Sequence, residues 1–299
     1  MSKNITIVGA TGNIGKKIVE LLLDNDVKVR AVARNISKLR MLEATGTEIY
    51  AGDIKNTSFI EKVFKGSDSI FAMLPPCYQL SDFQNEFRQM AESLTNAIRR
   101  SGISHVVLLS SVGADLPSGN GQISSLYEFE SKLKNVPELS VVALRCAFFM
   151  ENLLGSIPLI KSAGINGSIF NPASSFSMIA SNDISFTAYD YLINPSFYGF
   201  NVRYLLGPKD YTFTEVTSVI GAAIGKPDLQ YVKFSEEDFI KGIIGVGFSA
   251  NAAKALVEGL TALEKGNLSR DIKRDTSNTT STMLETFIQD VFFPAYVSI

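Results

Sequence analysis

The chain has 299 residues, of which 45% are hydrophobic and 19% are charged, so it can form one large domain or two unequal ones. A net charge of −2 excludes the basic surplus typical of nucleic-acid-binding proteins, and no apolar run is long enough to cross a bilayer. The few residues before the first apolar run leave no room for a signal peptide, so we expect a cytoplasmic protein. Cys77 and Cys146 lie far apart in apolar runs, and we expect reduced thiols, with a disulfide as the alternative.

The first predicted element is an apolar strand over residues 5–8 that leads directly into a glycine-rich turn. The turn has the spacing G-x-x-G-x-x-G, and an amphipathic helix over 16–24 follows it. Its first two glycines allow a tight turn close to a pyrophosphate, and Gly15 allows the helix to pack near the strand. Free N–H groups at the helix start then face the phosphates, although a purely structural turn is the alternative. The cofactor-binding residues expected here are Gly9, Thr11, Gly12, Asn13 and Ile14.

Short apolar runs alternate with helix-like segments through the first half of the chain. The further strands expected are 27–33, 48–51, 69–74, 105–110 and 140–145. The helices expected between them are 37–44, 58–65, 82–101 and 124–135. Because parallel strands need crossover connections, this alternation predicts an α/β fold with a Rossmann-type doubly wound parallel sheet. Ligands bind such sheets beyond the carboxyl ends of the strands.

The pattern loosens in the second half. Residues 155–176 are rich in Gly, Ser and Pro and predict an irregular excursion, and 177–195 predict a strand and a helix capped at Asn182-Asp183. The elements expected after these are a strand at 201–206, a helix at 211–225 opened by Thr212 or Thr214, a strand at 229–234, and helix with glycine breaks at 236–265. We therefore expect an NAD(P)-binding domain at 1–154 and a smaller C-terminal substrate lobe at 155–299, partly interleaved with the sheet.

The residues after the second predicted strand indicate which cofactor is bound. An acidic residue at this point would select NAD by binding the ribose 2′-hydroxyl, but Arg34 stands there, with Lys38 nearby. A guanidinium forms charge-assisted pairs with a 2′-phosphate, so the sequence favours NADP(H). A solvated surface arginine is the alternative interpretation.

The ends of the third and fourth predicted strands complete the expected cofactor site. Asp53, followed by Ile54, is expected to accept a hydrogen bond from the adenine amino group, or else to cap the next helix. Leu74 and Pro75 are expected to form an apolar wall beside the ribose and nicotinamide, although prolines after a strand are also ordinary loop residues.

Two serines end the fifth predicted strand. Small hydroxyl residues there leave space for a nicotinamide and can hydrogen-bond a substrate carbonyl, so we expect Ser110 beside the cofactor and Ser111 at the catalytic position. His105, the only histidine of the sequence, begins the same strand at the end away from this site. A histidine-based triad or zinc site is therefore excluded, and no metal is expected.

Together these motifs resemble the NmrA-like branch of the atypical short-chain dehydrogenases. The resemblance rests on the residues at 9–15, 33–35, 52–53, 110–111 and 145–152, and continues through 183–184, 206–208 and 245–266. It covers nearly the whole chain. It implies a Rossmann fold with a small C-terminal substrate lobe, in a family of NADPH-dependent quinone and dye reductases, isoflavone-type reductases, and redox-sensing regulators with little or no catalysis.

The catalytic pair of a typical short-chain dehydrogenase is incomplete in this chain. Such enzymes carry Tyr-x-x-x-Lys on the helix after the fifth strand, with both side chains on one helix face. Here Ser131 stands four residues after Tyr127, and Lys132 comes one residue late, about 100° further round the helix. We therefore expect Tyr127 to act as a weak, unassisted proton donor, or else to be a packing tyrosine.

An aromatic, apolar segment follows the sixth predicted strand. Phe148, Phe149 and Asn152 are expected to contact a flat hydrophobic acceptor opposite the nicotinamide. The sequence thus predicts an NADPH-dependent reductase of quinones or similar acceptors, because a reduced quinone oxygen needs less help from an acid than an alkoxide does. The alternative is a non-catalytic NADP(H)-binding redox sensor that acts through a protein partner. A nucleotide-sugar epimerase is the least favoured of the three functions, because it needs the intact Tyr–Lys pair. The expected partner is a small-molecule acceptor, and we expect no binding to nucleic acid or membrane. The sequence leaves open whether the chain forms a homodimer.

Overall fold

The computed structural model describes residues 3–25, 27–269 and 271–298. Its main element is a seven-stranded sheet with the strand order β10-β6-β5-β4-β1-β2-β3. All neighbouring strands of this sheet run parallel. The strands are β1 (Asn4–Val8), β2 (Lys28–Ala33), β3 (Glu48–Ala51), β4 (Ser69–Ala72), β5 (His105–Ser111), β6 (Ser140–Cys146) and β10 (Phe200–Leu205). From the central pair β1 and β4, the strand order runs outward in two opposite directions, through β2 and β3 on one side and through β5, β6 and β10 on the other. This order confirms the doubly wound, Rossmann-type fold.

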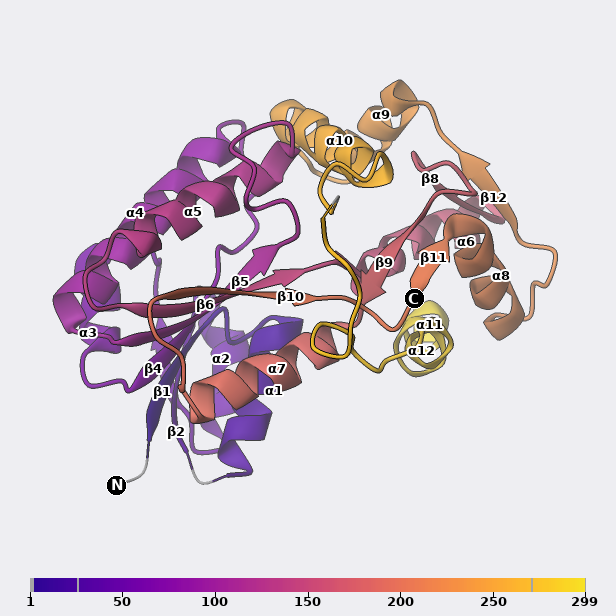
Figure 1. Cartoon of the computed structure of the whole chain (residues 1–299). Coiled ribbons are helices and arrows are strands. Elements are labelled where there is room, and N and C mark those ends of the chain that lie inside the picture. Colours follow the sequence, from indigo (N-terminus) through magenta and orange to yellow (C-terminus); the bar gives the residue numbers. More distant parts are fainter. Residues whose placement is uncertain (1–2, 26, 270, 299) are drawn as a thin grey trace.

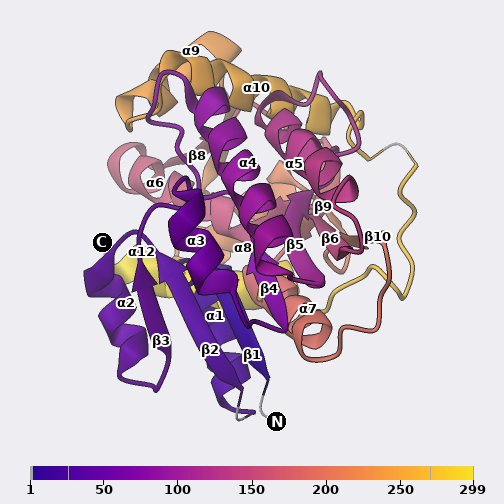
Figure 2. The same ribbon diagram turned by 90° about the vertical axis from the view of Figure 1, so that its left-hand side faces the viewer.

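Helices cover both faces of this sheet (Figures 1 and 2). One face carries α1 (Asn13–Leu23), α2 (Ile36–Glu43) and α7 (Ser181–Ile193), and the other carries α3 (Thr57–Phe64), α4 (Phe83–Ser101) and α5 (Ser124–Lys134). Consecutive strand residues point to opposite faces, so Ile70 packs with the α3–α4 core and Phe71 with the α1–α7 core. Burial on both faces explains why the central strands β4 and β6 are nearly continuous apolar runs in the sequence.

The second half of the chain adds two small sheets and several helices beside the carboxyl ends of the large sheet (Figure 1). The sheets have the orders β11-β9-β7 and β12-β8, from β7 (Phe148–Phe149), β8 (Ile165–Ser168), β9 (Ser175–Ile179), β11 (Asp210–Thr212) and β12 (Gln230–Lys233). The helical segments are η2 (Met150–Ser156), α6 (Ile157–Ala163), α8 (Phe213–Ala223), α9 (Glu236–Gly245), α10 (Ala250–Glu264), α11 (Leu284–Phe287), η3 (Ile288–Phe292) and α12 (Phe293–Ser298). Among the residues described, no helix is both long and apolar enough to cross a membrane.

Two expectations for this half need correction. The stretch 155–176 is not irregular, because it contains α6, β8 and the start of β9. The helix α7 is not capped at Asn182-Asp183: its N-cap is Ala180, and the Asp183 carboxylate accepts hydrogen bonds from the backbone N–H and hydroxyl of Thr282 instead. The segment 236–265 is two helices separated at 246–249, a stretch that contains Gly247, which agrees with the expected helix with glycine breaks. Thr212, and not Thr214, caps α8, in a reciprocal capping box with Glu215.

The chain returns from the small sheets to the large one before it ends. After β9 it forms α7, which packs on α1, and then β10, which pairs with β6 from Phe200 opposite Val141 to Leu205 opposite Cys146. One edge strand and one covering helix of the large sheet therefore come from the second half of the chain. This arrangement brings residues from both halves to the carboxyl ends of β4, β5 and β6.

Candidate functional site

The glycine turn after β1 is built on two close approaches. Gly9 has a φ of +76°, and a Cβ there would lie 2.7 Å from the Met73 sulfur. A Cβ on Gly15 would lie 2.3 Å from the Gly9 carbonyl oxygen, so only glycine lets α1 come this near the turn. Gly12 differs from expectation, because its φ of −84° is open to any residue and the tight turn depends on Gly9 alone.

The start of α1 is suited to hold an anion. Gly12 supplies no side-chain cap, so the first N–H groups of the helix keep their hydrogen-bonding capacity at the edge where β1 ends. Thr11 is half-buried and Asn13 is exposed beside this turn. The Ile14 side chain is 8% exposed and packs in the α1–α7 core, so Ile14 can offer a ligand only its backbone. These features fit a dinucleotide pyrophosphate.

Two cations lie where β2 ends. Arg34 follows the strand directly, and Lys38 lies in the first turn of α2, which Asn35 caps by accepting the Lys38 backbone N–H at 3.1 Å. Both cationic side chains are exposed, and neither forms a salt bridge or a hydrogen bond with another described residue. They are therefore free to pair with a phosphate.

At the end of β3, Asp53 is exposed and its carboxylate contacts Lys55. Its carboxylate accepts the Lys55 backbone N–H at 2.9 Å, and the Lys55 ammonium lies 3.9 Å away. It does not cap α3, because Asn56 does so by accepting the Phe59 N–H at 3.1 Å. The exposed carboxylate retains further acceptor capacity for an adenine amino group. Ile54 is buried in the α3–α4 core, so its side chain cannot contact a cofactor.

A cavity of about 1060 Å³ begins at the carboxyl ends of β4, β5 and β6 and extends under the second half of the chain. Leu74, Ser110 and Ser111 line it at the sheet, whereas Pro75 does not. Phe148, Phe149 and Asn152 line it as well, as predicted for residues that contact an acceptor. Asp238, which is exposed, is the one charged side chain among the described residues of the wall.

Most of the cavity wall was not predicted from the sequence. Aromatic rings from distant parts of the second half gather there, including Phe170, Phe213 and Phe234. Phe170 stacks on Phe213 with ring centroids 5.0 Å apart and meets Phe148 edge-on at 6.0 Å. These rings share no sequence spacing, so only the fold places them together. A wall of this kind suits a large, flat, uncharged molecule.

The roof of the cavity is joined to the loop after β4. Tyr78 in that loop stacks on Phe248, between α9 and α10, with centroids 5.4 Å apart, and its carbonyl accepts the Ser249 N–H at 2.9 Å. Burial raises the pKa of Tyr78 to about 12, so its phenol stays neutral at physiological pH. Tyr78 and Phe248 both line the cavity.

The two serines at the end of β5 already have protein partners. Ser110 donates its hydroxyl to the buried Glu130 carboxylate at 2.7 Å, and Ser111 donates to the Val112 carbonyl at 3.0 Å. Glu130 also binds Arg145 through two hydrogen bonds, of 2.7 and 3.1 Å. Burial opposes the charge of Arg145, but the hydrogen bonds and charge of Glu130 outweigh it and raise its pKa. This buried ion pair therefore fixes Ser110 at the cavity wall.

The expected proton donor is not at the cavity. Tyr127 is half-buried on α5 and does not line the wall, although its neighbours Ser125 and Leu126 do. The structure thus brings the predicted cofactor and acceptor residues to one edge of the sheet, but leaves Tyr127 outside that group.

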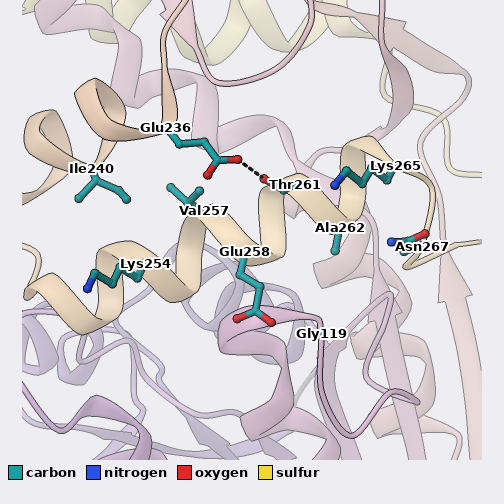
Figure 3. A pocket seen from close by; sticks show the side chains of 10 residues that line it. All are labelled: Gly119, Glu236, Ile240, Lys254, Val257, Glu258, Thr261, Ala262, Lys265 and Asn267. Carbon is teal, nitrogen blue, oxygen red and sulfur yellow. Dashed lines mark hydrogen bonds between the residues drawn. The ribbon is translucent and has the colours of Figure 1, made fainter.

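A second, smaller hollow lies on the outer side of α10, with a volume of about 430 Å³ (Figure 3). Its wall is charged and includes Lys254, Glu258 and Lys265. Glu236, at the start of α9, accepts the Thr261 hydroxyl across it at 3.4 Å. None of the residues expected at the cofactor or acceptor site lies in this hollow.

Sequence comparison identifies the family of this chain. The NmrA-like family profile matches residues 1–288, so the chain belongs to the NmrA-like family. The NAD(P)H azoreductase of Xenophilus azovorans is 27% identical over 257 residues, which cover 85% of each protein.

Solved structures share the fold. The NADPH-dependent quinone oxidoreductase of Escherichia coli, solved with NADPH, superposes with a TM-score of 0.79 at 22% identity, over 96% of this chain and 99% of that one. The triphenylmethane reductase of Citrobacter sp., solved with NADP(H), has a TM-score of 0.75 at 19% identity, over 95% and 99% of the two chains. NAD(P)H-dependent reductases are thus among the relatives of this protein.

Proposed function

We propose that this protein is an NADPH-dependent reductase that transfers hydride to a flat, hydrophobic acceptor such as a quinone. The observation that carries the proposal is the aromatic cavity, which opens at the carboxyl ends of β4, β5 and β6, beside the glycine turn. In doubly wound sheets this edge is where a cofactor and a substrate meet. The azoreductase and quinone oxidoreductase relatives support the same class of reaction.

The residues at the strand ends fit NADP(H). The N–H groups at the start of α1 would bind the pyrophosphate, Arg34 and Lys38 the 2′-phosphate, and Asp53 the adenine amino group. NADPH supplies the hydride when it is bound. The chain's own residues orient the two reactants: Leu74 and Ser111 form the floor of the cavity, and the phenylalanine rings exclude water and hold the acceptor flat.

A second candidate function is a non-catalytic NADP(H) sensor that acts through a protein partner. The position of Tyr127 favours it, because no side chain that readily donates a proton at neutral pH stands on the described cavity wall. The size and apolar lining of the cavity favour the reductase, since a sensor has no need of a separate acceptor site.

NADPH consumption by the purified protein, measured with a panel of quinones, azo dyes and aldehydes, tests the proposal. We expect turnover with a quinone that changes less than about twofold in Tyr127→Phe, because Tyr127 lies outside the cavity. Tyr198→Phe, at a tyrosine that is 86% exposed, is the matched control. Turnover lost only in Tyr127→Phe would make this tyrosine the acid. Tight NADPH binding without consumption across the panel would favour the sensor.

A further inference from the structure

Two side-chain amides on the cavity wall, those of Gln122 and Asn152, have no hydrogen-bond partner among the described residues. Asn152 is exposed, whereas Gln122 is half-buried. Gln122 lines the cavity, and its side chain forms no hydrogen bond with any described residue. Its Oε1 atom is buried without a partner, whereas Nε2 at the other end of the amide is not among the buried unpartnered atoms and so remains accessible. An apolar cavity strengthens any hydrogen bond that this accessible end makes to a ligand.

The backbone around Gln122 is held in place on both sides. Asn120, which is fully buried, donates its side-chain N–H groups to the carbonyls of Gly113 at 2.9 Å and Leu116 at 2.8 Å, which ties the turn to the loop after β5. Gly121 has a φ of +58° and lies so close to α10 that a Cβ there would be 1.9 Å from the Ala255 carbonyl oxygen. The backbone of Gln122 is therefore held at the wall of the cavity in which hydride transfer is proposed.

Three other polar side chains of the wall are already engaged. Ser110 donates to Glu130, Ser111 donates to the Val112 carbonyl, and Asn166 donates to the Thr217 hydroxyl at 2.8 Å. The lysine of the Tyr-x-x-x-Lys pair is replaced by Ser131, and Tyr127 is outside the cavity. The chemistry thus needs another group that stabilises charge on the acceptor.

We propose that Gln122 donates its side-chain N–H to the acceptor oxygen on which negative charge develops. Hydride transfer from bound NADPH would break the C–H bond of the reduced nicotinamide and form a C–H bond at a quinone carbon conjugated with the carbonyl, so that NADPH is oxidised to NADP⁺ and the quinone gains two electrons. The electron pair displaced from the quinone C=O bond remains on that oxygen as an anion until a proton from water neutralises it. An amide N–H that contacts this oxygen lowers the energy of the anion, as an oxyanion-hole donor does. This assignment rests on the reductase proposed above.

The direct test is Gln122→Met, which keeps the length of the side chain and removes its N–H groups. With a neutral quinone, kcat should fall on the order of 10- to 100-fold. With a triarylmethyl cation dye, which takes hydride at carbon and becomes neutral, kcat should change less than about twofold, because no oxygen gains charge. Equal losses on both acceptors would indicate a merely structural role and overturn the assignment, as would an unchanged kcat with the quinone.

Gly259→Ala displaces the same amide without altering Gln122. A Cβ on Gly259 would lie 2.8 Å from the Gln122 Oε1, so the flexible carboxamide must move. We expect kcat to fall with the quinone and not with the cationic dye, as in Gln122→Met. The Kd of NADPH should stay unchanged, and the α10 helix should not be weakened, because alanine favours a helix more than glycine does. Gly245→Ala, in α9 with open space around it, is the control and should leave both activities unchanged.

A binding measurement separates failure of this assignment from failure of the proposed function. The Kd of the quinone for the NADP⁺-loaded protein, from equilibrium dialysis, should rise about fivefold in Gln122→Met. A raised Kd in a protein that reduces no acceptor would support the Gln122 contact and reject the reductase. An unchanged Kd with unchanged turnover would reject Gln122 and keep the reductase, and an unchanged Kd without turnover would reject both.

Discussion

At the scale of single residues, the choice of cofactor rests on one exposed guanidinium. Arg34→Glu replaces a cation beside the expected 2′-phosphate by an anion, so the NADPH Kd should rise on the order of 10- to 100-fold while the NADH Kd changes little. Quenching or enhancement of the reduced nicotinamide fluorescence measures both constants. Arg40→Glu, an equally exposed charge reversal on α2, is the control. An unaltered NADPH Kd in Arg34→Glu would remove Arg34 from the cofactor site.

The single histidine gives a prediction about pH. His105 donates to or accepts from the Ser104 hydroxyl at 2.9 Å and packs edge-on against Phe197 with centroids 5.4 Å apart. Burial lowers its pKa below the ordinary value of 6.5. The unfolded chain therefore binds the proton more readily, so His105 reduces the stability of the fold as the pH falls through 6.5 towards its folded pKa.

The measurement is direct because the sequence contains one histidine. Its imidazole proton signal in NMR should titrate with a midpoint below 6.5. In His105→Asn the free energy of unfolding should depend less on pH between about 7 and 5. A midpoint at or above the ordinary value would contradict the burial argument.

At the scale of elements, the glycine turn between β1 and α1 leaves no room for a side chain at Gly15. In Gly15→Ala the new Cβ would lie 2.3 Å from the Gly9 carbonyl oxygen, so α1 must move away from the turn. We expect a loss of about 1–3 kcal/mol in unfolding free energy and a large loss of NADPH affinity. Urea unfolding and fluorescence titration measure these changes. The control is Gly245→Ala, where the new Cβ lies in open space and the unfolding free energy should stay the same or rise slightly. An unchanged or higher unfolding free energy in Gly15→Ala would contradict the close packing of α1 on the turn.

The central strands of the large sheet could be predicted because β1, β4, β5 and β6 are apolar runs that are buried on both faces. Thr212 could be predicted as a cap because its partner Glu215 stands three residues away. The cap expected at Asp183 was wrong because its carboxylate binds Thr282, which is 99 residues distant and leaves no local signal. Glu130 was overlooked for the same reason, since its partners Ser110 and Arg145 lie on other elements.

The candidate site could be predicted only where strand ends define it. Leu74, Ser110, Phe148 and their neighbours follow strands directly, and the structure places them at the cavity. The distant rings of Phe170 and Phe234 could not be found, because their meeting depends on tertiary packing and not on any spacing. The sequence therefore locates the part of the site that lies at the strand ends, and not the aromatic rings that the second half of the chain contributes to the cavity wall.

At the scale of the whole molecule, the two halves of the chain depend on each other. A fragment of residues 1–154 lacks α7 and β10, which cover and extend the large sheet. Ile184, Ala188 and Leu192 of α7 are fully buried against it. Losing such contacts, at about 2 kcal/mol for each large apolar side chain, together with an edge strand removes most of the stability of a typical domain.

We expect the fragment 1–154 to lack a cooperative thermal transition and the near-ultraviolet circular dichroism of packed aromatic rings. Co-expression with residues 155–299 should restore both signals and NADPH binding. A sharp unfolding transition of the fragment alone would show that the sheet is complete without its seventh strand.

The origin of β10 in the second half of the chain also bears on how this protein diversifies. A genetic recombination near residue 154 would transplant only the part of the acceptor wall that follows it, together with a strand and a helix of the neighbouring sheet. Grafted in this way, the new segment would meet a foreign β6 and α1 and fit them poorly. New acceptor preferences in this lineage should therefore arise through point substitutions in the cavity wall, and not through exchange of whole modules.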